Sequence, residues 1–264
     1  MHALLLPIIE CILISLAAGM IFGIFGSGSG LIMTPGYYYV LSHFNWIPDH
    51  RMQMAIASTA MASGLLGLFS ARVQIKKNNI DKNGIKKMVP GLLTGTILAI
   101  LLASVIPSAI LKKAFGIVVI LVALWLWQYK TENDKNAWSL NGAANQILSF
   151  FIGLIWFLLG VAVFLAPYLL KCKIDMRKAV GSASVLACIF SLIAAFLFMI
   201  IGYFVMGISL QHIGYVNLLI TVCAVIPGAL GGHFGSHISV RLPQKHLKQI
   251  YAALVLLVGI LMVI

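Results

Sequence analysis

Long apolar runs recur along the whole chain, and they restrict its fold more than any other feature. A helix needs about 20 mostly apolar residues to cross the hydrocarbon core of a bilayer. Runs that approach or reach this length lie at residues 3–25, 54–71, 88–106, 109–128, 143–159, 179–201, 216–239 and 247–264. Two shorter runs, 29–42 and 160–170, have the length of partial helices. We predict an all-α polytopic membrane protein with about eight full spans and two short or broken helices.

The composition agrees with a bilayer environment. Of the 264 residues 61% are hydrophobic and 9% charged, whereas about a quarter of an ordinary soluble domain is charged. The first run has no Lys or Arg before it and no clear small-residue cleavage site, so we interpret it as a membrane segment rather than a signal peptide. The four cysteines lack CxxC spacing. We expect them to pack as small side chains rather than to bind zinc or form disulfides.

The basic residues gather in four loops, and this predicts the orientation of the chain. Fifteen of the 18 Lys and Arg residues lie within 72–87, 130–135, 171–178 and 241–248. Cytoplasmic loops of membrane proteins carry the excess of Lys and Arg. We therefore expect these four loops on the cytoplasmic side of the cell membrane and both termini outside. The same distribution accounts for the net charge of +12 without a nucleic-acid-binding surface.

The two halves of the chain share short motifs. Four elements of the first half have counterparts in the second: MAIAST (54–59) and KAVGSA (178–183), PGLLTG (90–95) and PGALGG (227–232), IPSAILKKAF (106–115) and LPQKHLKQIY (242–251), and Pro35 and Pro167. Each half then holds five segments, and an odd number inverts the second half, as in many secondary transporters. We predict two inverted membrane repeats, 1–128 and 143–264, joined by a polar cytoplasmic linker at 129–142.

A glycine-rich stretch interrupts the apolar sequence before Pro35. Its members are Gly26, Ser27, Gly28, Ser29 and Gly30. In hydrocarbon, an unwound backbone is tolerated only where it is buried in protein or lines an aqueous cavity. The helix start that follows presents amide N–H groups and a positive dipole end, which suit a small oxyanion, and the two hydroxyls could add donors. The alternative is that the three glycines only allow close helix packing.

Hydroxyl side chains near the starts of two later segments are further candidates for the substrate site. Ser58, Thr59 and Ser182 would face the interface between the two halves. There they could contact a substrate, or they could hydrogen-bond to the backbone of their own helices. Both interpretations are compatible with their positions.

Glu10 is the one carboxylate inside the first apolar run. It lies about 10 Å along the helix from the terminus, so a proton carrier inside the membrane and a solvated interfacial residue both fit its position. His233 and His237 have i, i+4 spacing and share a helix face. No Asp, Glu or Cys stands within helical reach to complete a metal site, so we expect no metal there.

The order of these motifs resembles the TauE/SafE family of sulfite and organosulfonate exporters, over about residues 19–264. Its most specific parts are GSGSGLIMTP at 26–35, AIAST at 55–59, AVGSA at 179–183 and PGALGGHFGSHISVRLP at 227–243. The resemblance implies an anion transporter of the cell membrane. One departure is WFLLGVAVFLAP at 156–167, which keeps only Gly160 where the family usually has a second glycine-rich break. We therefore expect a single substrate site, biased to the first half.

Motifs of enzymes are missing from the sequence. It has no HExxH, no serine elbow and no pair of intramembrane aspartates, and GSGSG lacks the spacing of a nucleotide-binding loop. We predict a secondary transporter, without a cofactor, that exports a small and sulfur-containing anion. Because there is no Walker motif, we expect an ion gradient or the membrane potential to supply the energy.

A non-transport membrane scaffold or assembly factor is the alternative, since scaffolds need no motif. It does not explain polar glycine backbone at membrane depth. The expected partners are the anion and the lipid bilayer, and a homo-oligomer is compatible with the sequence.

Overall fold

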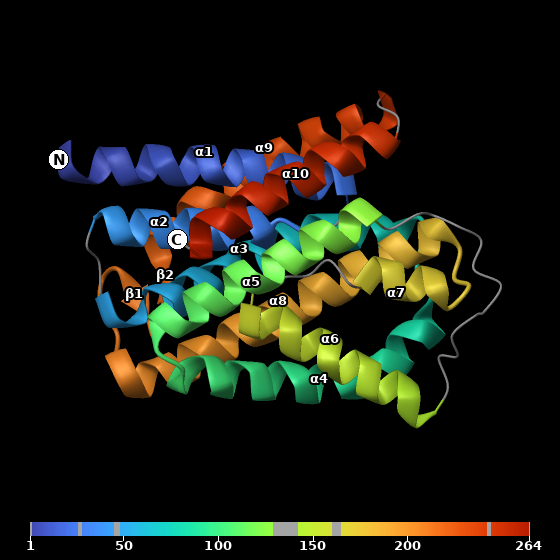
Figure 1. The fold of residues 1–264 in the computed structure, drawn as a ribbon, viewed down its shortest axis with the longest axis horizontal. Helices are drawn as coiled ribbons and strands as arrows, with labels where there is room; N and C mark the ends of the chain where they lie inside the picture. Colours follow the sequence, from blue (N-terminus) through green and yellow to red (C-terminus); the bar gives the residue numbers. More distant parts are fainter. Residues whose placement is uncertain are drawn as a thin grey trace.

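The computed structural model describes residues 2–25, 28–44, 48–128, 142–159, 165–241 and 244–263, which form a bundle of α-helices (Figure 1). Its helices are α1 (His2–Phe25), α2 (Gly30–His43), α3 (Arg51–Lys76), α4 (Lys82–Val105), α5 (Ser108–Gln128), α6 (Ala143–Leu159), α7 (Leu165–Lys171), α8 (Met176–Met206), α9 (Leu218–Arg241) and α10 (Gln244–Val263). A 3-10 turn, η1 (Pro48–His50), precedes α3. Over its described residues each predicted apolar segment coincides with one of these helices, and the predicted all-α fold is confirmed. Residues 160–164 of the short segment 160–170 lie outside the described residues.

Five of the described helices are long and apolar enough to cross a membrane. Their apolar parts are Leu5–Ile24, Arg51–Lys76, Lys82–Val105, Arg177–Met206 and Leu218–Gly235. Large apolar side chains such as Phe69, Phe204 and Val222 are exposed on the outside of these helices, as expected for surfaces that face lipid. The other predicted spans, α5, α6 and α10, do not meet the same criteria over their described residues, so eight full spans stay a prediction.

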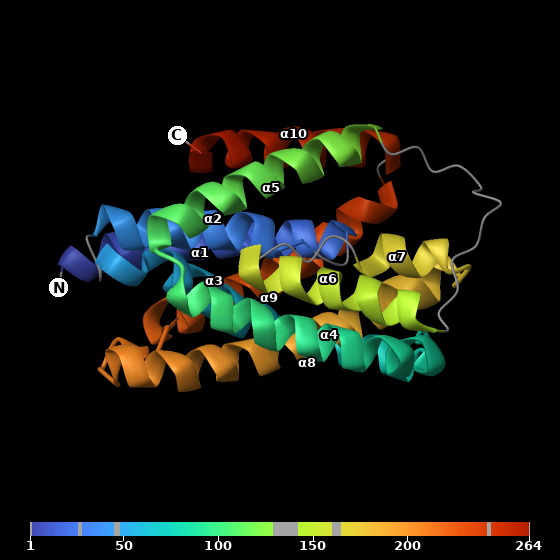
Figure 2. The same ribbon diagram turned by 60° about the horizontal axis from the view of Figure 1, so that its bottom comes forward.

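The main helix contacts join the two halves of the sequence. Helix α1 packs along α9, α4 along α6, α3 along α8 and α5 along α10 (Figure 2). If every helix is exchanged for its counterpart five places along the chain, the α1–α9 pair becomes the α6–α4 pair. The same exchange leaves the α3–α8 and α5–α10 pairs unchanged. The pattern of contacts is therefore two-fold.

The helix ends sort into two groups along the bundle. Both termini, the α4–α5 turn and the α8–α9 connection lie at one end, on the left of Figure 1. The α3–α4 and α7–α8 turns and the last turn of α9 lie at the other end. The α8–α9 connection holds a hairpin, β1 (His212–Ile213) and β2 (Val216–Asn217), whose Tyr215 is buried against Phe198 and His50, at ring-centroid distances of 6.2 and 5.5 Å.

Glycines bring the backbones of α4 and α6 together. A Cβ atom on Gly91 or Gly95 would collide with backbone atoms of α6, and one on Gly153 would lie 2.7 Å from the Leu92 carbonyl oxygen. Such close approach requires residues without a side chain. Gly91 and Gly95, which have GxxxG spacing, therefore pack two helices together.

Glycines also bring the backbones of α1 and α9 together. Cβ atoms on Gly231 and Gly235 would collide with the backbone of α1. Gly228, which has GxxxG spacing with Gly232, also packs closely, because a Cβ on Gly19 of α1 would collide with the Gly228 carbonyl. A Cβ on Gly228 would meet the Leu66 side chain of α3, and one on Gly232 would come no closer than 3.6 Å to α1. Overlapping glycine pairs on one helix occupy different faces, and spacing alone does not say which face meets which neighbour.

Candidate functional site

The glycine-rich break separates α1 from α2, and the structure describes its last three residues. Gly26 and Ser27 lie outside the described residues. Gly28 has a φ of +93°, in the left-handed region that favours glycine. Gly28, Ser29 and Gly30 are all buried. The break is therefore inside the protein, where an unwound backbone is tolerated.

The first turn of α2 leaves backbone donors at the break. The Gly28 carbonyl accepts from the Leu31 amide at 3.1 Å, and the Ser29 carbonyl accepts from the amides of Ile32 and Met33 at 3.1 and 2.9 Å. Within the described residues, no acceptor is found for the amides of Ser29 and Gly30. These are the orphan donors that begin any helix. Near them an anion would also meet the positive end of the helix dipole.

A cavity of about 30 Å³ lies against this break. Its walls come from the end of α1, the start of α2, the middle of α3, the end of α6 and the middle of α8. A volume of this size holds roughly two water molecules. A small oxyanion would enter only after some separation of these helices.

Four hydroxyl side chains belong to the lining of the cavity. Ser29, Thr59, Ser63 and Ser191 all line it. The Ser29 and Ser63 Oγ atoms are 3.2 Å apart, and Ser63 Oγ also lies 3.8 Å from the Met33 sulfur. Thr59 is 5% exposed, and its Oγ1 has no hydrogen-bond partner in the described structure. A buried hydroxyl without a partner is rare in proteins, and a ligand or water in the cavity would satisfy it.

Large apolar side chains also line the cavity. They are Phe22, Ile56, Trp156 and Phe157. No Lys, Arg, His, Asp or Glu occurs among the described residues that line the cavity, and none occurs in the sequence at 26–27 or 160–164, beside the helix breaks. The site therefore offers neutral donors and an apolar wall, without a counter-charge.

Ser58 and Ser182, which the sequence grouped with the break, lie elsewhere. Ser58 Oγ accepts a hydrogen bond from the Asn217 amide at 2.9 Å, and Ser182 Oγ accepts one from the Asp81 amide at 2.8 Å. The serines lie on α3 and α8, and the bonded amides directly precede α9 and α4. The two serines hold the same position in MAIAST and KAVGSA. Their hydrogen bonds are therefore two-fold related, like the helix pairs.

Ser63 and Ser191 were not singled out from the sequence. Thr59, Ser63 and Gly67 follow one another at intervals of four on α3, and all three line the cavity. A stripe of small and hydroxyl residues on one helix face was the signal that could have found Ser63. Ser191 corresponds to Gly67 when the MAIAST and KAVGSA motifs are aligned, so the repeat could have found it.

Comparison with known proteins identifies the family. The model of the sulfite exporter TauE/SafE family matches residues 11–262. The chain belongs to this family. The match contains the glycine-rich break and both central helices of this TauE/SafE protein, so the resemblance drawn from the sequence is confirmed.

Two relatives cover almost the whole TauE/SafE chain. A "probable membrane transporter protein" of Haemophilus influenzae is 22% identical over 256 residues, which are 96% of this chain and 97% of that protein. A protein with the same description from Methanocaldococcus jannaschii is 26% identical over 272 residues, 99% of this chain and 96% of that protein. No solved structure matches the chain. Family membership and five apolar helices of membrane-spanning length identify a multi-pass membrane protein.

The other ionisable candidates of this TauE/SafE protein lie away from the cavity. Glu10 is half-buried on α1, and its Oε2 has no hydrogen-bond partner among the described atoms. His233 is exposed on α9, and the side chain of His237 lies outside the described residues. In the part of the chain that the structure describes, no three His, Cys, Asp or Glu residues come together as metal ligands would.

Proposed function

We propose that this TauE/SafE protein is a secondary transporter that exports a small, sulfur-containing anion across the cell membrane. The family is described as sulfite exporters, and both relatives are named as membrane transporters. An inside-negative membrane potential drives anions outward, at about 2.3 kcal/mol per charge per 100 mV. Export of an anion therefore needs no nucleotide-binding domain.

The observation that carries this proposal is the cavity at the glycine-rich break. Its lining includes Ser29 and Gly30 at the start of α2, the hydroxyls of Ser63 and Ser191, and Thr59, whose hydroxyl has no hydrogen-bond partner among the described residues. These groups can all donate to the oxygens of an anion. Residues of α3 and α8 that follow the MAIAST and KAVGSA motifs line the site at corresponding positions. Only the first half of the sequence contributes a glycine-rich break.

The lack of a cation in the cavity favours a monoanion as substrate. Removing an ion from water is costly, and neutral donors offset less of that cost than a buried positive charge would. A dianion such as sulfate would lose more hydration energy than hydrogen sulfite or an organosulfonate. The wall that contains Phe22 and Trp156 could also contact the carbon group of an organosulfonate. We therefore propose hydrogen sulfite and small organosulfonates as the substrate class.

We propose that the site lies between two inverted repeats, 1–128 and 143–264, and three observations support this architecture. The helix contacts are two-fold, and the Ser58 and Ser182 hydrogen bonds are related by the same exchange. Helices α3 and α8 run in opposite directions (Figures 1 and 2). Counterparts that run in opposite directions are expected when the two-fold axis lies in the membrane plane. Two inverted repeats can open one cavity between them alternately to either side of the membrane.

The positions of the basic residues support an orientation with both termini outside. The described residues of three of the four basic segments, 72–87, 171–178 and 241–248, gather at the end of the bundle opposite the termini (Figure 1). The fourth, 130–135, lies outside the described residues. An excess of Lys and Arg marks the cytoplasmic side. The hairpin between α8 and α9 would then face the exterior.

Proteoliposomes loaded with one anion at a time provide the test. Hydrogen sulfite, methanesulfonate and sulfate are compared at equal concentration, with an inside-negative potential set by a potassium gradient and valinomycin. We expect protein-dependent efflux of both monoanions and much slower efflux of sulfate. Efflux of both monoanions at the rate of protein-free liposomes would refute the proposed function. Sulfate efflux at the rate of the monoanions would refute the selectivity alone.

A further inference from the structure

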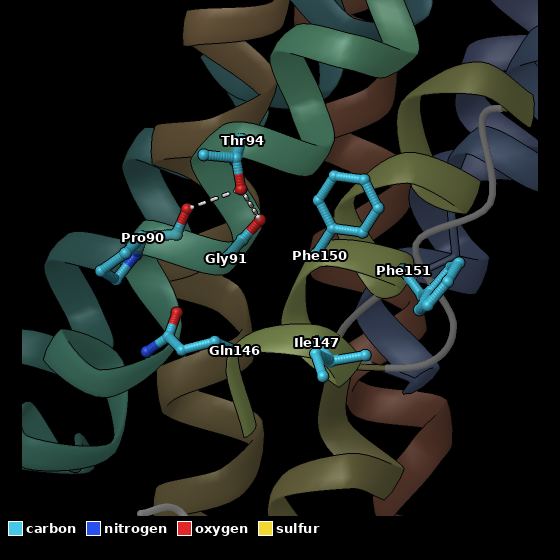
Figure 3. A pocket seen from close by; sticks show the side chains of 7 residues that line it. All are labelled: Pro90, Gly91, Thr94, Gln146, Ile147, Phe150 and Phe151. Carbon is cyan, nitrogen blue, oxygen red and sulfur yellow. Dashed lines mark hydrogen bonds between the residues drawn. The ribbon is translucent and has the colours of Figure 1, made fainter. Parts of the chain in front are cut away.

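A hollow of about 510 Å³ lies on the outer surface of the bundle between α4 and α6 (Figure 3). Pro90, Gly91 and Thr94 of α4 form one wall, and α6 forms the other with Gln146, Ile147, Phe150 and Phe151. At Gly91 the two helices are in close contact, because a Cβ there would lie 2.5 Å from the Gln146 carbonyl oxygen. The hollow is separate from the central cavity, with which it shares no residue.

The groups inside the hollow suit a hydrocarbon chain. The Thr94 hydroxyl donates to the Pro90 and Gly91 carbonyls at 3.1 and 3.0 Å, so its proton is already used within α4 (Figure 3). The side chains of Ile147 and Phe151 are 56% and 50% exposed. Because α4 is long and apolar enough to span a membrane, such a surface contacts lipid rather than water.

Positive charge lies beside one end of the hollow. Lys86 and Lys87 are exposed one helical turn before Pro90 and Gly91. The side-chain amides of Asn145 and Gln146 donate to the Lys87 carbonyl at 2.8 and 2.7 Å. These bonds hold the start of α6, with its positive dipole end, next to the two lysines. Neither α4 nor α6 contains an acidic residue.

We propose that this hollow binds an anionic phospholipid, with one acyl chain between α4 and α6 and the phosphate beside Lys86, Lys87 and the first turn of α6. An apolar hollow followed by cations at the membrane surface matches the order of chain and phosphate in the lipid. Lysines and a helix N-terminus are both phosphate-binding groups. The second half has no such site, because Cys223 and Ala224 hold the corresponding positions when PGLLTG and PGALGG are aligned.

The experiment titrates purified protein in detergent with phosphatidylglycerol, which is anionic, or with phosphatidylcholine of the same acyl chains. Bound lipid is counted by native mass spectrometry, and thermal unfolding is followed in parallel. The double variant Lys86→Gln/Lys87→Gln removes the charges, and Thr94→Phe fills the hollow while leaving them in place. Lys76→Gln/Lys77→Gln is the matched control, because both lysines are exposed at the end of α3 and the charge change is the same.

Wild-type protein should bind phosphatidylglycerol more tightly than phosphatidylcholine. A surface cation contributes a factor of roughly five to binding of an anionic lipid, so the Lys86→Gln/Lys87→Gln variant should lose about 25-fold in affinity. The Lys76→Gln/Lys77→Gln control should stay close to wild type. Equal binding of the two lipids by wild type, or equal weakening in both double variants, would overturn the proposal. Unchanged phosphatidylglycerol binding by Thr94→Phe would do so even if the charge variant failed to fold.

Discussion

Replacing Thr59 by Val should stabilise the protein and weaken its binding of the anion. The hydroxyl Oγ1 is buried and has no hydrogen-bond partner in the part of the chain that the structure describes, and an unsatisfied polar group of this kind costs about 1–3 kcal/mol. Val has the same shape without the hydroxyl, so the substitution removes that cost in the empty protein. If the hydroxyl donates to a bound anion, its loss removes a hydrogen bond to a charged group, worth about 1.5–3 kcal/mol. Affinity should then fall roughly 10- to 150-fold.

The assay pairs thermal unfolding of the purified protein with anion efflux from proteoliposomes over a range of internal concentrations. Ser58→Ala is the control from the same helix. Its hydroxyl accepts from the buried Asn217 amide, so its removal should destabilise the protein by about 1–3 kcal/mol and leave the affinity unchanged. If the Thr59→Val variant binds the anion with native affinity, the Thr59 hydroxyl does not contact the anion. Lower stability in that variant would mean that the hydroxyl is satisfied within the protein, and the argument from an unpaired group would fail.

Three further predictions concern the break, the helix contacts and the orientation. Gly28→Val should abolish efflux, because a β-branched residue is strained at a φ of +93°. The control Gly232→Ala should insert and transport normally, since its Cβ meets nothing closer than 3.6 Å. Native efflux by folded Gly28→Val protein would contradict the prediction. Gly95→Ala should lower the yield of folded protein, measured by size-exclusion chromatography, because its Cβ collides with the backbone of α6; a native yield would show that α4 and α6 separate easily. In a cysteine-free background, an impermeant thiol reagent added outside should label single cysteines at 207–212 and spare those at 76–82, and the reverse pattern would invert the proposed topology.

The helices were predictable because their apolar runs match the thickness of a bilayer. The start of α2 at Gly30 followed from the glycines before it, which do not favour a continuous helix. The partners of the hydroxyl side chains were not predictable. Ser58 and Ser182 bond to amides 159 and 101 positions away in the sequence, and no local pattern reports contacts of that range.

Only part of the candidate site was predictable, because its other residues are brought together by contacts between segments far apart in the sequence. The break and Thr59 line the cavity, but Ser191 and Trp156 reach it only because α8 packs against α3 and α6 packs against α4. The Gly231 and Gly235 contacts with α1 also depend on the rotation of α9 about its axis. A GxxxG spacing fixes which residues share a helix face, and the tertiary packing then selects the neighbour.

The glycine contacts also bear on which parts of the molecule can move as rigid bodies. In the α1–α9 and α4–α6 pairs, backbone lies on backbone with no side chain between them to change rotamer, so each pair should behave as one stiff rod. Each rod takes one helix from the first half of the sequence and one from the second. A motion that opens the cavity would therefore slide two composite rods past the central α3–α8 pair, and the moving bodies would not coincide with the two sequence repeats.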